Sequence, residues 1–239
     1  MLRARNSTTS RVPAARVTTN LGVVRLANDS FDTAWNDLTS HHYNGEDHTG
    51  GAWPLFDGVG DYIVAPGPYK ETGVTALPIT ADLTSATMEC WAKPSATGLA
   101  ANSRLISINS DTTTGYLIIS LRTNGELRCY VNNSNRMNTA AGVITVSNWF
   151  HIAMTTGAGV TPIIYVNGAD VTSAGAGALA YPQSNSQISI GATLYNPIPP
   201  GPSTTQLFNG DIDTARVYER ILSPAEVLMN YNAGRAAHQ

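Results

Sequence analysis

Apolar and polar residues alternate in several short stretches, most clearly within residues 149–170. The sequence FHIAMT at 150–155 has the period of two that is typical of a β-strand with one buried face. Gly-Ala-Gly at 157–159 predicts a chain reversal, and the β-branched and aromatic run at 161–166 predicts the returning strand. Asn167-Gly168 suits the positive φ angles of a tight type I′ turn. This stretch therefore predicts strand, turn, strand, turn.

The same alternation predicts strands before and after this hairpin. They cover residues 61–64, 86–94, 104–109, 115–122, 126–131, 188–191 and 208–218. Asn124-Gly125 predicts a second tight hairpin. Residues 134–147 and 172–186 are predicted to be loops, and the prolines within 195–205 argue against sheet or helix there.

One short helix is predicted near the C-terminal end. Ser223 suits the N-cap position, Pro224 the first helical position, and Glu226 the position where a capping box needs an acid. Gly234 is the expected stop. The pattern thus predicts an all-β chain with a single short helix.

Length and composition agree with one β-sandwich domain. The 239 residues are 42% hydrophobic, enough for a full core, and only 13% are charged. Such low charge, with abundant Gly, Pro, Ser and Thr, is typical of turn-rich sandwiches. No apolar run approaches the ~20 residues that span a bilayer, and no apolar N-terminal segment suggests a secretion signal. We therefore expect no membrane contact and no obvious export.

The charge is unevenly distributed. Residues 1–28 hold five arginines and no acid, so the rest of the chain has nine of the fourteen basic residues and all seventeen acidic ones. We expect an extended basic arm at 1–28, a polar loop region at 29–52 and the β-sandwich domain at 53–239. Alone, the arm lacks the apolar residues needed to fold. It is either a tail or, as we favour, a segment held on a neighbouring subunit.

Two other groups of residues leave alternatives open. Cys90 and Cys129 lie in predicted strands, and two buried reduced thiols are favoured over a disulfide. The loop from His41 to His48 contains His41, His42, Glu46, Asp47 and His48. It is either a transition-metal site or, as favoured without Cys or helical spacing, an exposed polar loop.

Several stretches resemble one known family. Trp-x-His-Ile-Ala at 149–153 precedes Tyr-Val-Asn-Gly at 165–168, Phe-Asp-Gly-x-x-Asp-Tyr stands at 56–62, and Phe-x-Gly-x-Ile-Asp at 208–213 begins the run to Glu226. In this order they are similar to the concanavalin A-like, laminin-G-type jelly roll. The resemblance implies a two-sheet antiparallel jelly-roll sandwich, and glycan binding as the family's usual activity.

Turn carboxylates are the candidate metal ligands. Asp57, Asp61, Asp211 and Asp213 offer the oxygen ligands that Ca²⁺ takes, and related jelly rolls often bind this ion. The alternative is that these carboxylates cap turns and accept backbone N–H bonds.

Catalytic motifs are not evident. Some concanavalin A-like folds are glycosidases with a Glu-x-Asp-x-x-Glu strand, which this chain lacks. Glu89 and Glu126 are isolated and are expected on solvated strand faces, His151 is expected to be structural, and there is no Gly-x-Ser-x-Gly motif. The sequence predicts that the chain is not an enzyme.

Loop aromatics are the candidate sugar contacts, since stacking on a sugar ring needs an exposed aromatic side chain. They are Trp35, Tyr43, Tyr181 and Tyr195. Each is equally explained as a partly buried anchor. Arginines without interleaved aromatics would give nucleic acid only non-specific, salt-sensitive attraction, so no specific nucleic-acid partner is expected.

The N-terminal residues are also similar to the start of some bacteriophage structural proteins, through Leu-Arg-x-Arg-Asn-Ser-Thr at 2–8, then Val-Pro and Leu-Gly. The leading prediction is a non-enzymatic virion protein, a head-decoration (cement) or tail-associated component. It would be homo-oligomeric and touch neighbouring virion proteins through the arm residues Arg3, Arg5, Arg11 and Arg16, with host glycans as further partners. The alternative is a carbohydrate-binding or adhesion module of a cell-surface or secreted protein.

Overall fold

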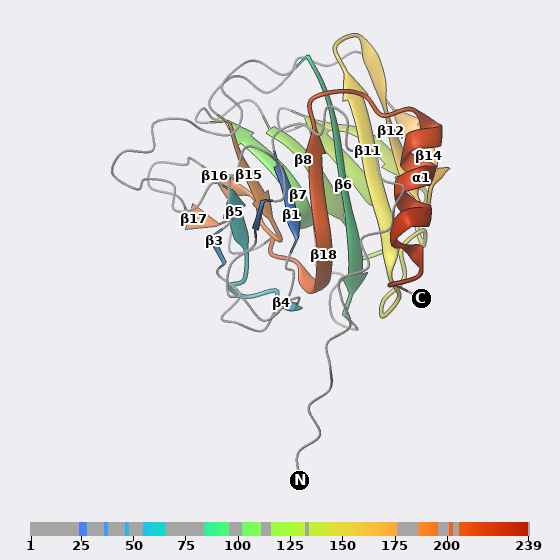
Figure 1. The fold of residues 1–239 in the computed structure, drawn as a ribbon. Helices are drawn as coiled ribbons and strands as arrows, with labels where there is room; N and C mark the ends of the chain where they lie inside the picture. The colour runs from blue at the N-terminus through green and yellow to red at the C-terminus, as the bar shows by residue number, and fades with distance from the viewer. Residues whose placement is uncertain are drawn as a thin grey trace.

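Two antiparallel β-sheets lie face to face in the computed structural model, with an α-helix against the outer side of one sheet (Figure 1). The structure describes residues 24–27, 36–37, 46–47, 55–65, 84–95, 102–110, 116–131, 134–175, 186–195, 201–202 and 206–238.

The first sheet, here named the helix-side sheet, has eight strands in the described residues. Their order is β13 (Ala169–Asp170), β12 (Val160–Val166), β11 (Phe150–Gly157), β6 (Ser85–Pro94), β18 (Asn209–Tyr218), β1 (Val24–Ala27) and β2 (Asn36–Asp37), while β4 (Leu55–Asp57) pairs with β18 off this path. All pairs are antiparallel.

The second sheet, named the back sheet, also has eight described strands, all paired antiparallel. Their order is β14 (Thr172–Gly175), β10 (Ser134–Thr139), β9 (Leu127–Val131), β8 (Tyr116–Leu121), β7 (Ser103–Ser110), β15 (Ser186–Ile190), β5 (Ile63–Ala65) and β3 (Glu46–Asp47). A separate ribbon pairs β16 (Leu194–Tyr195) with β17 (Gly201–Pro202).

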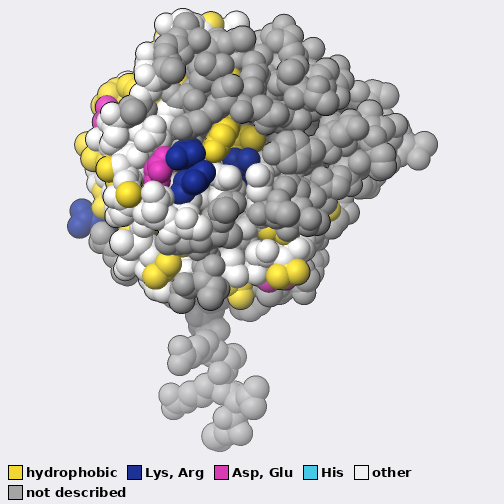
Figure 2. All heavy atoms as spheres, turned by 180° about the vertical axis from the view of Figure 1, so that it is seen from behind, with side chains coloured by type: hydrophobic (Ala, Val, Ile, Leu, Met, Phe, Trp, Pro, Cys, Tyr) yellow, Lys and Arg dark blue, Asp and Glu magenta, His cyan; other side chains and the backbone are white. Residues whose placement is uncertain are grey.

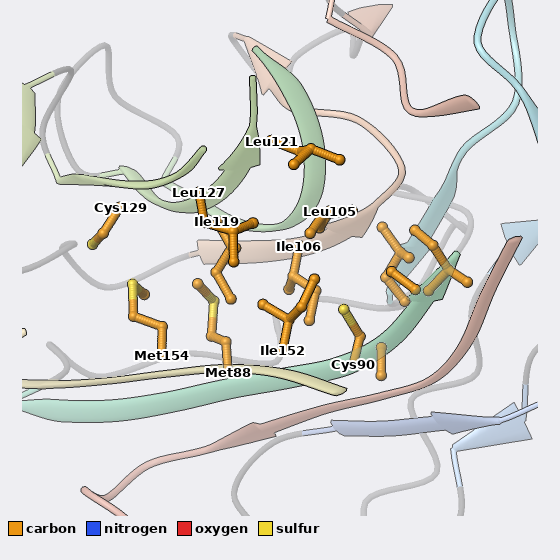
Figure 3. Packing of buried hydrophobic residues seen from close by; sticks show 14 of the residues in the cluster. Met88, Cys90, Leu105, Ile106, Ile119, Leu121, Leu127, Cys129, Ile152 and Met154 are labelled. Carbon is orange, nitrogen blue, oxygen red and sulfur yellow. The ribbon is translucent and has the colours of Figure 1, made fainter. Parts of the chain in front are cut away.

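The main core lies between the two sheets, because alternate residues of each strand point inward. Figure 3 shows the two sets facing each other: Met88, Cys90, Ile152 and Met154 from the helix-side sheet, and Leu105, Ile106, Ile119, Leu121, Leu127 and Cys129 from the back sheet. Both cysteines are buried and free, so the prediction of reduced thiols is confirmed. Burial raises the pKa of both thiols.

A second, smaller core lies under the helix. Helix α1 (Pro224–Arg235) packs on the outer face of the helix-side sheet, and its Val227 is buried with Tyr165, Tyr218 and Leu222. Strand β6 is therefore buried on both faces over most of its length. The alternation in the sequence correctly predicted the strand, although the face expected to be solvated lies under α1.

The predicted fold class, an all-β two-sheet antiparallel jelly-roll sandwich with one short C-terminal helix, is confirmed in the described residues. The type I′ turn is present, with φ of 53° at Asn167 and 80° at Gly168. The capping box is also present: Ser223 accepts from the Glu226 backbone N–H, and the Glu226 carboxylate accepts from the Ser223 N–H.

Four local predictions are wrong. The loops expected at 134–147 and 172–186 both begin with a strand, because β10 pairs with β9 and β14 pairs with β10. The Pro-rich segment contains the β16–β17 pair, where Pro202 lies in a two-stranded ribbon that has open edges. The helix continues to Arg235. Gly234 is needed instead for packing, since a Cβ there would overlap the Trp91 indole.

The N-terminal region is described in part. Residues 24–27, at the end of the predicted arm, form β1 and pair with β18, and Glu46–Asp47 pairs with β5. Most of the predicted arm and of the 29–52 region lies outside the described residues, so the proposed division into arm, loop region and domain stays a prediction. Among the described residues, no helix is long and apolar enough to cross a membrane.

Candidate functional site

The outer face of the back sheet carries a row of polar residues across three strands. Arg104 of β7 pairs with Ser120 of β8, and Ser120 pairs with Arg128 of β9. Their neighbours Leu121 and Leu127 belong to the core, so the alternation of a strand turns the row outward. Register thus brings together two cationic side chains that are far apart in sequence.

Next to this row stands an aromatic side chain. Tyr130 follows Arg128 by two residues on the same strand, so both side chains are on the outer face. The Arg104 guanidinium lies over the Tyr130 ring, 4.9 Å from its centroid. Such contact is favourable because the ring face is electron-rich.

Two side-chain amides hold these groups in place. Gln206 Oε1 accepts hydrogen bonds from Arg104 Nε at 3.1 Å and Nη2 at 2.9 Å. Asn102 Oδ1 accepts from Arg122 Nη1 at 2.9 Å and from the Tyr130 hydroxyl at 3.3 Å. The polar face is therefore ordered by hydrogen bonds between side chains.

A single described carboxylate stands among the three arginines of this face. Glu126 Oε1 accepts a hydrogen bond from Arg128 Nε at 2.6 Å, and Oε2 accepts from Asn124 Nδ2 at 3.3 Å. The Arg128 hydrogen bond, with the nearby Arg122 charge, lowers the pKa of Glu126. Figure 2, which views the molecule from behind, shows basic side chains gathered beside an acidic one and hydrophobic ones.

The hydroxyl at the centre of the row is not hydrogen-bonded. Ser120 is fully buried, and its Oγ has no hydrogen-bond partner. Most buried polar atoms in proteins are satisfied. Ser120 therefore leaves an unpaired hydroxyl beneath the row, enclosed between Arg104 and Arg128. The planar cation of Arg128, the side-chain amides and the Tyr130 phenol together suit a polar, hydroxyl-rich ligand.

A second polar cluster lies on the opposite side of the molecule, under α1. The Glu89 carboxylate of β6 forms an ion pair with Arg216 and accepts hydrogen bonds from Tyr218 Oη at 3.3 Å and from Asn230 Nδ2 at 3.1 Å. His151 Nε2 lies 3.3 Å from Glu89 Oε2. All five side chains are buried.

This Glu89 cluster is structural. Burial opposes ionisation of Glu89, but the Arg216 charge and the His151 contact outweigh it and lower the pKa to about 2. Because Glu89 is 0% exposed and α1 supplies Asn230 above it, the carboxylate is enclosed by protein. The expectation that Glu89 lies on a solvated strand face is wrong, since the helix that covers it comes much later in the sequence. The structural role expected for His151 agrees with its burial here.

The Glu89 cluster predicts a pH dependence of stability. The folded-state pKa is lowered from its ordinary 4.5 to about 2, so the stabilisation is complete above the unfolded-state pKa and is lost as pH falls through this window. The shift corresponds to about 3 kcal/mol of unfolding free energy. Urea denaturation of the wild type at pH 7 and pH 3 measures the loss. At pH 3 about 2 kcal/mol of this stabilisation is gone, so Glu89→Gln should show a loss smaller by about 2 kcal/mol. Equal losses in both proteins would contradict this assignment.

The four aspartates predicted from the sequence are engaged by protein groups. Asp57 Oδ1 accepts from the N–H groups of Val59, Gly60 and Asp61, while Asp61 Oδ2 accepts from the Asp57 N–H at 2.8 Å. These backbone bonds lower the pKa of Asp57.

The other two aspartates lie on β18 and face basic side chains. Asp211 pairs with Lys93 at 3.3 Å, and Asp213 Oδ2 lies 2.8 Å from Nε2 of His238. In the described part of the chain, no group of three or more His, Cys, Asp and Glu side chains is arranged to hold a metal. Asp57 and Asp61 therefore match the turn-capping alternative, whereas Asp211 and Asp213 are engaged by Lys93 and His238. A Ca²⁺ site at these four residues stays a prediction.

The predicted sugar-stacking aromatics are not placed together by the described residues. Trp35, Tyr43 and Tyr181 lie outside those residues, and so do the arm residues Arg3, Arg5, Arg11 and Arg16 and most of the His41–His48 loop. The backbone of Tyr195 is in β16, paired with Gly201.

The polar face on the back sheet is not among the sites predicted from the sequence. Arg128 and Tyr130 do alternate with Leu127 and Cys129, which is a detectable signal for an outer face bearing a cation and an aromatic. The partner Arg104 had no such signal, because only the register of β7, β8 and β9 brings it beside them.

The two-sheet antiparallel β-sandwich defines the class of the protein. The family model described as the Concanavalin A-like lectin/glucanases superfamily matches residues 57–228. The chain belongs to this superfamily, as the sequence resemblance implied. No curated protein matches the sequence. Domains of this superfamily sometimes bind Ca²⁺, and laminin-G-like domains are usually extracellular or surface-associated.

Similar solved structures include enzymes and binding domains. A Trypanosoma rangeli sialidase in complex with sialic acid has a TM-score of 0.62 at 14% identity, covering 89% of this chain and 33% of that one. The binding domain of botulinum neurotoxin serotype D/C has a TM-score of 0.56 at 16% identity, and the match covers 88% of this chain and 51% of that one. The binding domain of Paraclostridial Mosquitocidal Protein 1 has a TM-score of 0.56 at 16% identity, and the match covers 88% of this chain and 52% of that one. The chain thus spans a third to half of these proteins, and the likeness concerns the fold.

The prediction that the chain is not an enzyme is wrong, because missing motifs do not support that conclusion. Sialidases are among the similar structures, at 13–16% identity, and the same fold serves binding domains. The absent Glu-x-Asp-x-x-Glu run excludes one glycosidase arrangement and not enzymes as a class. Enzymatic activity is not established by a likeness of fold.

Proposed function

We propose that the chain is a carbohydrate-binding module whose ligand face is the outer face of the back sheet. The observation that carries the proposal is the pair of half-buried side chains Arg128 and Tyr130 on the outer face of β9, with the buried Arg104 guanidinium against the Tyr130 ring. Membership of a lectin/glucanase superfamily supports it, and so do neighbours described as binding domains and a sialidase in complex with sialic acid.

The chemistry of this face suits sugars. Guanidinium N–H groups and side-chain amides present several fixed hydrogen-bond donors, and sugar hydroxyls and ring oxygens accept such bonds. A phenol ring supplies an apolar surface with a polar tip. Ordered side chains lose little entropy on binding, and the Gln206 and Asn102 bonds supply that order here.

A glycan array followed by titration calorimetry tests the proposal. We expect selective binding, and we expect Tyr130→Ala to weaken it by about tenfold or more, as loss of an aromatic contact and of the Arg104 support predicts. Tyr130→Phe is the matched variant: it keeps the ring and removes only the hydroxyl that contacts Asn102, so it should retain most of the affinity. Thermal melting confirms that both variants fold.

Two results would count against this function. The array could show no selective binding by the folded chain, or Tyr130→Ala could bind as well as the wild type, which would move the ligand to another surface.

The virion role predicted from the N-terminal residues stays a prediction, together with assembly on neighbouring subunits, because it depends on an arm that lies largely outside the described residues. A glycan-binding face is compatible with that role. It is equally compatible with the alternative of a cell-surface or secreted module, which matches the usual location of laminin-G-like domains.

A further inference from the structure

The polar face of the back sheet carries more positive than negative charge. Among its described side chains are the three guanidinium groups of Arg104, Arg122 and Arg128 and the single carboxylate of Glu126. The whole chain, by contrast, has a net charge of −3. This face therefore favours a negatively charged ligand more than the average surface of the molecule does.

The Glu126 carboxylate is paired with Arg128, and the Arg122 backbone N–H donates to the Glu126 carbonyl at 2.9 Å. Glu126 Oε1 and Oε2 lie 2.6 and 3.5 Å from Arg128 Nε and Nη2, a two-point contact with one guanidinium. The Arg122 charge also acts on it. A guanidinium recognises a carboxylate through two parallel N–H bonds. The protein's own carboxylate thus shows where a ligand carboxylate would be recognised.

We infer that this face binds an acidic sugar, one whose carboxylate is held by Arg128 and Arg122 while Glu126 competes with it for the same two cations. The inference rests on the proposed glycan-binding function and specifies its ligand class. The buried Ser120 hydroxyl, which has no hydrogen-bond partner, is a second and independent observation of a polar site in this row.

The partial burial of these groups makes the charge contacts effective. The side chains of Arg128 and Glu126 are only 25% and 10% exposed. Charged hydrogen bonds in such surroundings are stronger than those between fully exposed groups, which water and salt screen. A ligand carboxylate that replaces Glu126 at Arg128 would therefore form a directed contact.

The test compares matched acidic and neutral sugars with a variant that should gain affinity. The probes are sialyllactose against lactose, and glucuronic acid oligomers against glucose oligomers. We expect the acidic member of at least one pair to bind the wild type about tenfold or more tightly. Glu126→Gln, which removes the competitor, should tighten binding of that acidic sugar and raise its preference over the neutral partner about tenfold.

The matched control is Glu219→Gln, which makes the same charge change at an exposed position following β18 of the other sheet. It should alter no affinity by more than about twofold, since distant exposed charges are screened. Arg128→Gln should abolish the preference for the acidic sugar. A gain in affinity also cannot be produced by misfolding.

The outcomes separate this inference from the function on which it rests. If neutral and acidic partners bind equally, or if Glu126→Gln gains nothing over Glu219→Gln, the acidic ligand class is wrong although glycan binding stands. If a folded chain binds no glycan of either kind, both are overturned.

Discussion

Glu89→Ala is expected to lower the free energy of unfolding by about 3–5 kcal/mol, because it leaves Arg216 charged and buried without its counter-ion. Arg216 is 3% exposed and Asn230 is 1% exposed, so water cannot easily replace the carboxylate. Urea denaturation at neutral pH, followed by tryptophan fluorescence, measures the loss.

Two further variants distinguish a buried charge from a simple loss of packing. The double variant Glu89→Leu with Arg216→Met removes the unpaired charge and should recover part of the stability. Recovery is incomplete because the buried Tyr218 hydroxyl and Asn230 amide lose the carboxylate that accepts from them. Glu219→Ala, at an exposed position, should change stability by no more than about 0.5 kcal/mol. A double variant as unstable as Glu89→Ala would show that the charge is not the cause.

Gly125→Ala is expected to be the most damaging glycine substitution near the polar sheet face. Gly125 has a φ of +73°, and a Cβ there would overlap the backbone carbonyl of Ile144. Left-handed backbone costs a non-glycine residue about 1–2 kcal/mol, and displacement of a packed backbone adds about 1–3 kcal/mol. The expected loss of unfolding free energy is therefore about 3 kcal/mol, measured by urea denaturation.

Gly159 provides the matched control. It has the same φ of +73°, but nothing lies within 4 Å of its Cβ position. Gly159→Ala should therefore lower the free energy of unfolding by only about 1 kcal/mol, the cost of the left-handed backbone alone. Equal losses at the two positions would mean that the Ile144 carbonyl moves aside at no cost.

The fold was predictable because its signals are local. Alternation along β6, β9 and β11 reports which residues face the core, and Asn167-Gly168 fixes a hairpin within four residues. The helix start was equally readable, since Ser223 and Glu226 cap each other across one turn. The helix end was misjudged because Gly234 is required by contact with Trp91, a residue far away in sequence.

The candidate site was not predictable from local signals. Arg104, Ser120 and Arg128 come together only through the pairing of three strands, and that register includes an irregularity between Arg104 and Ile106. Glu89 was misplaced for a related reason: Asn230, which lies 141 residues later, completes its surroundings. A period of two indicates that a strand has two faces, but not what covers the second one.

The position of β18 has a consequence for how this protein is made. This strand lies in the sheet between β6 and β1, although it is the last strand in the sequence. A ribosome must therefore release residues 209–218 before β6 gains its neighbour on that side, and until then an apolar strand edge stays open to other chains. Such late closure over a long sequence separation slows folding and favours aggregation, so slower translation at lower temperature or chaperone co-expression should raise the soluble yield.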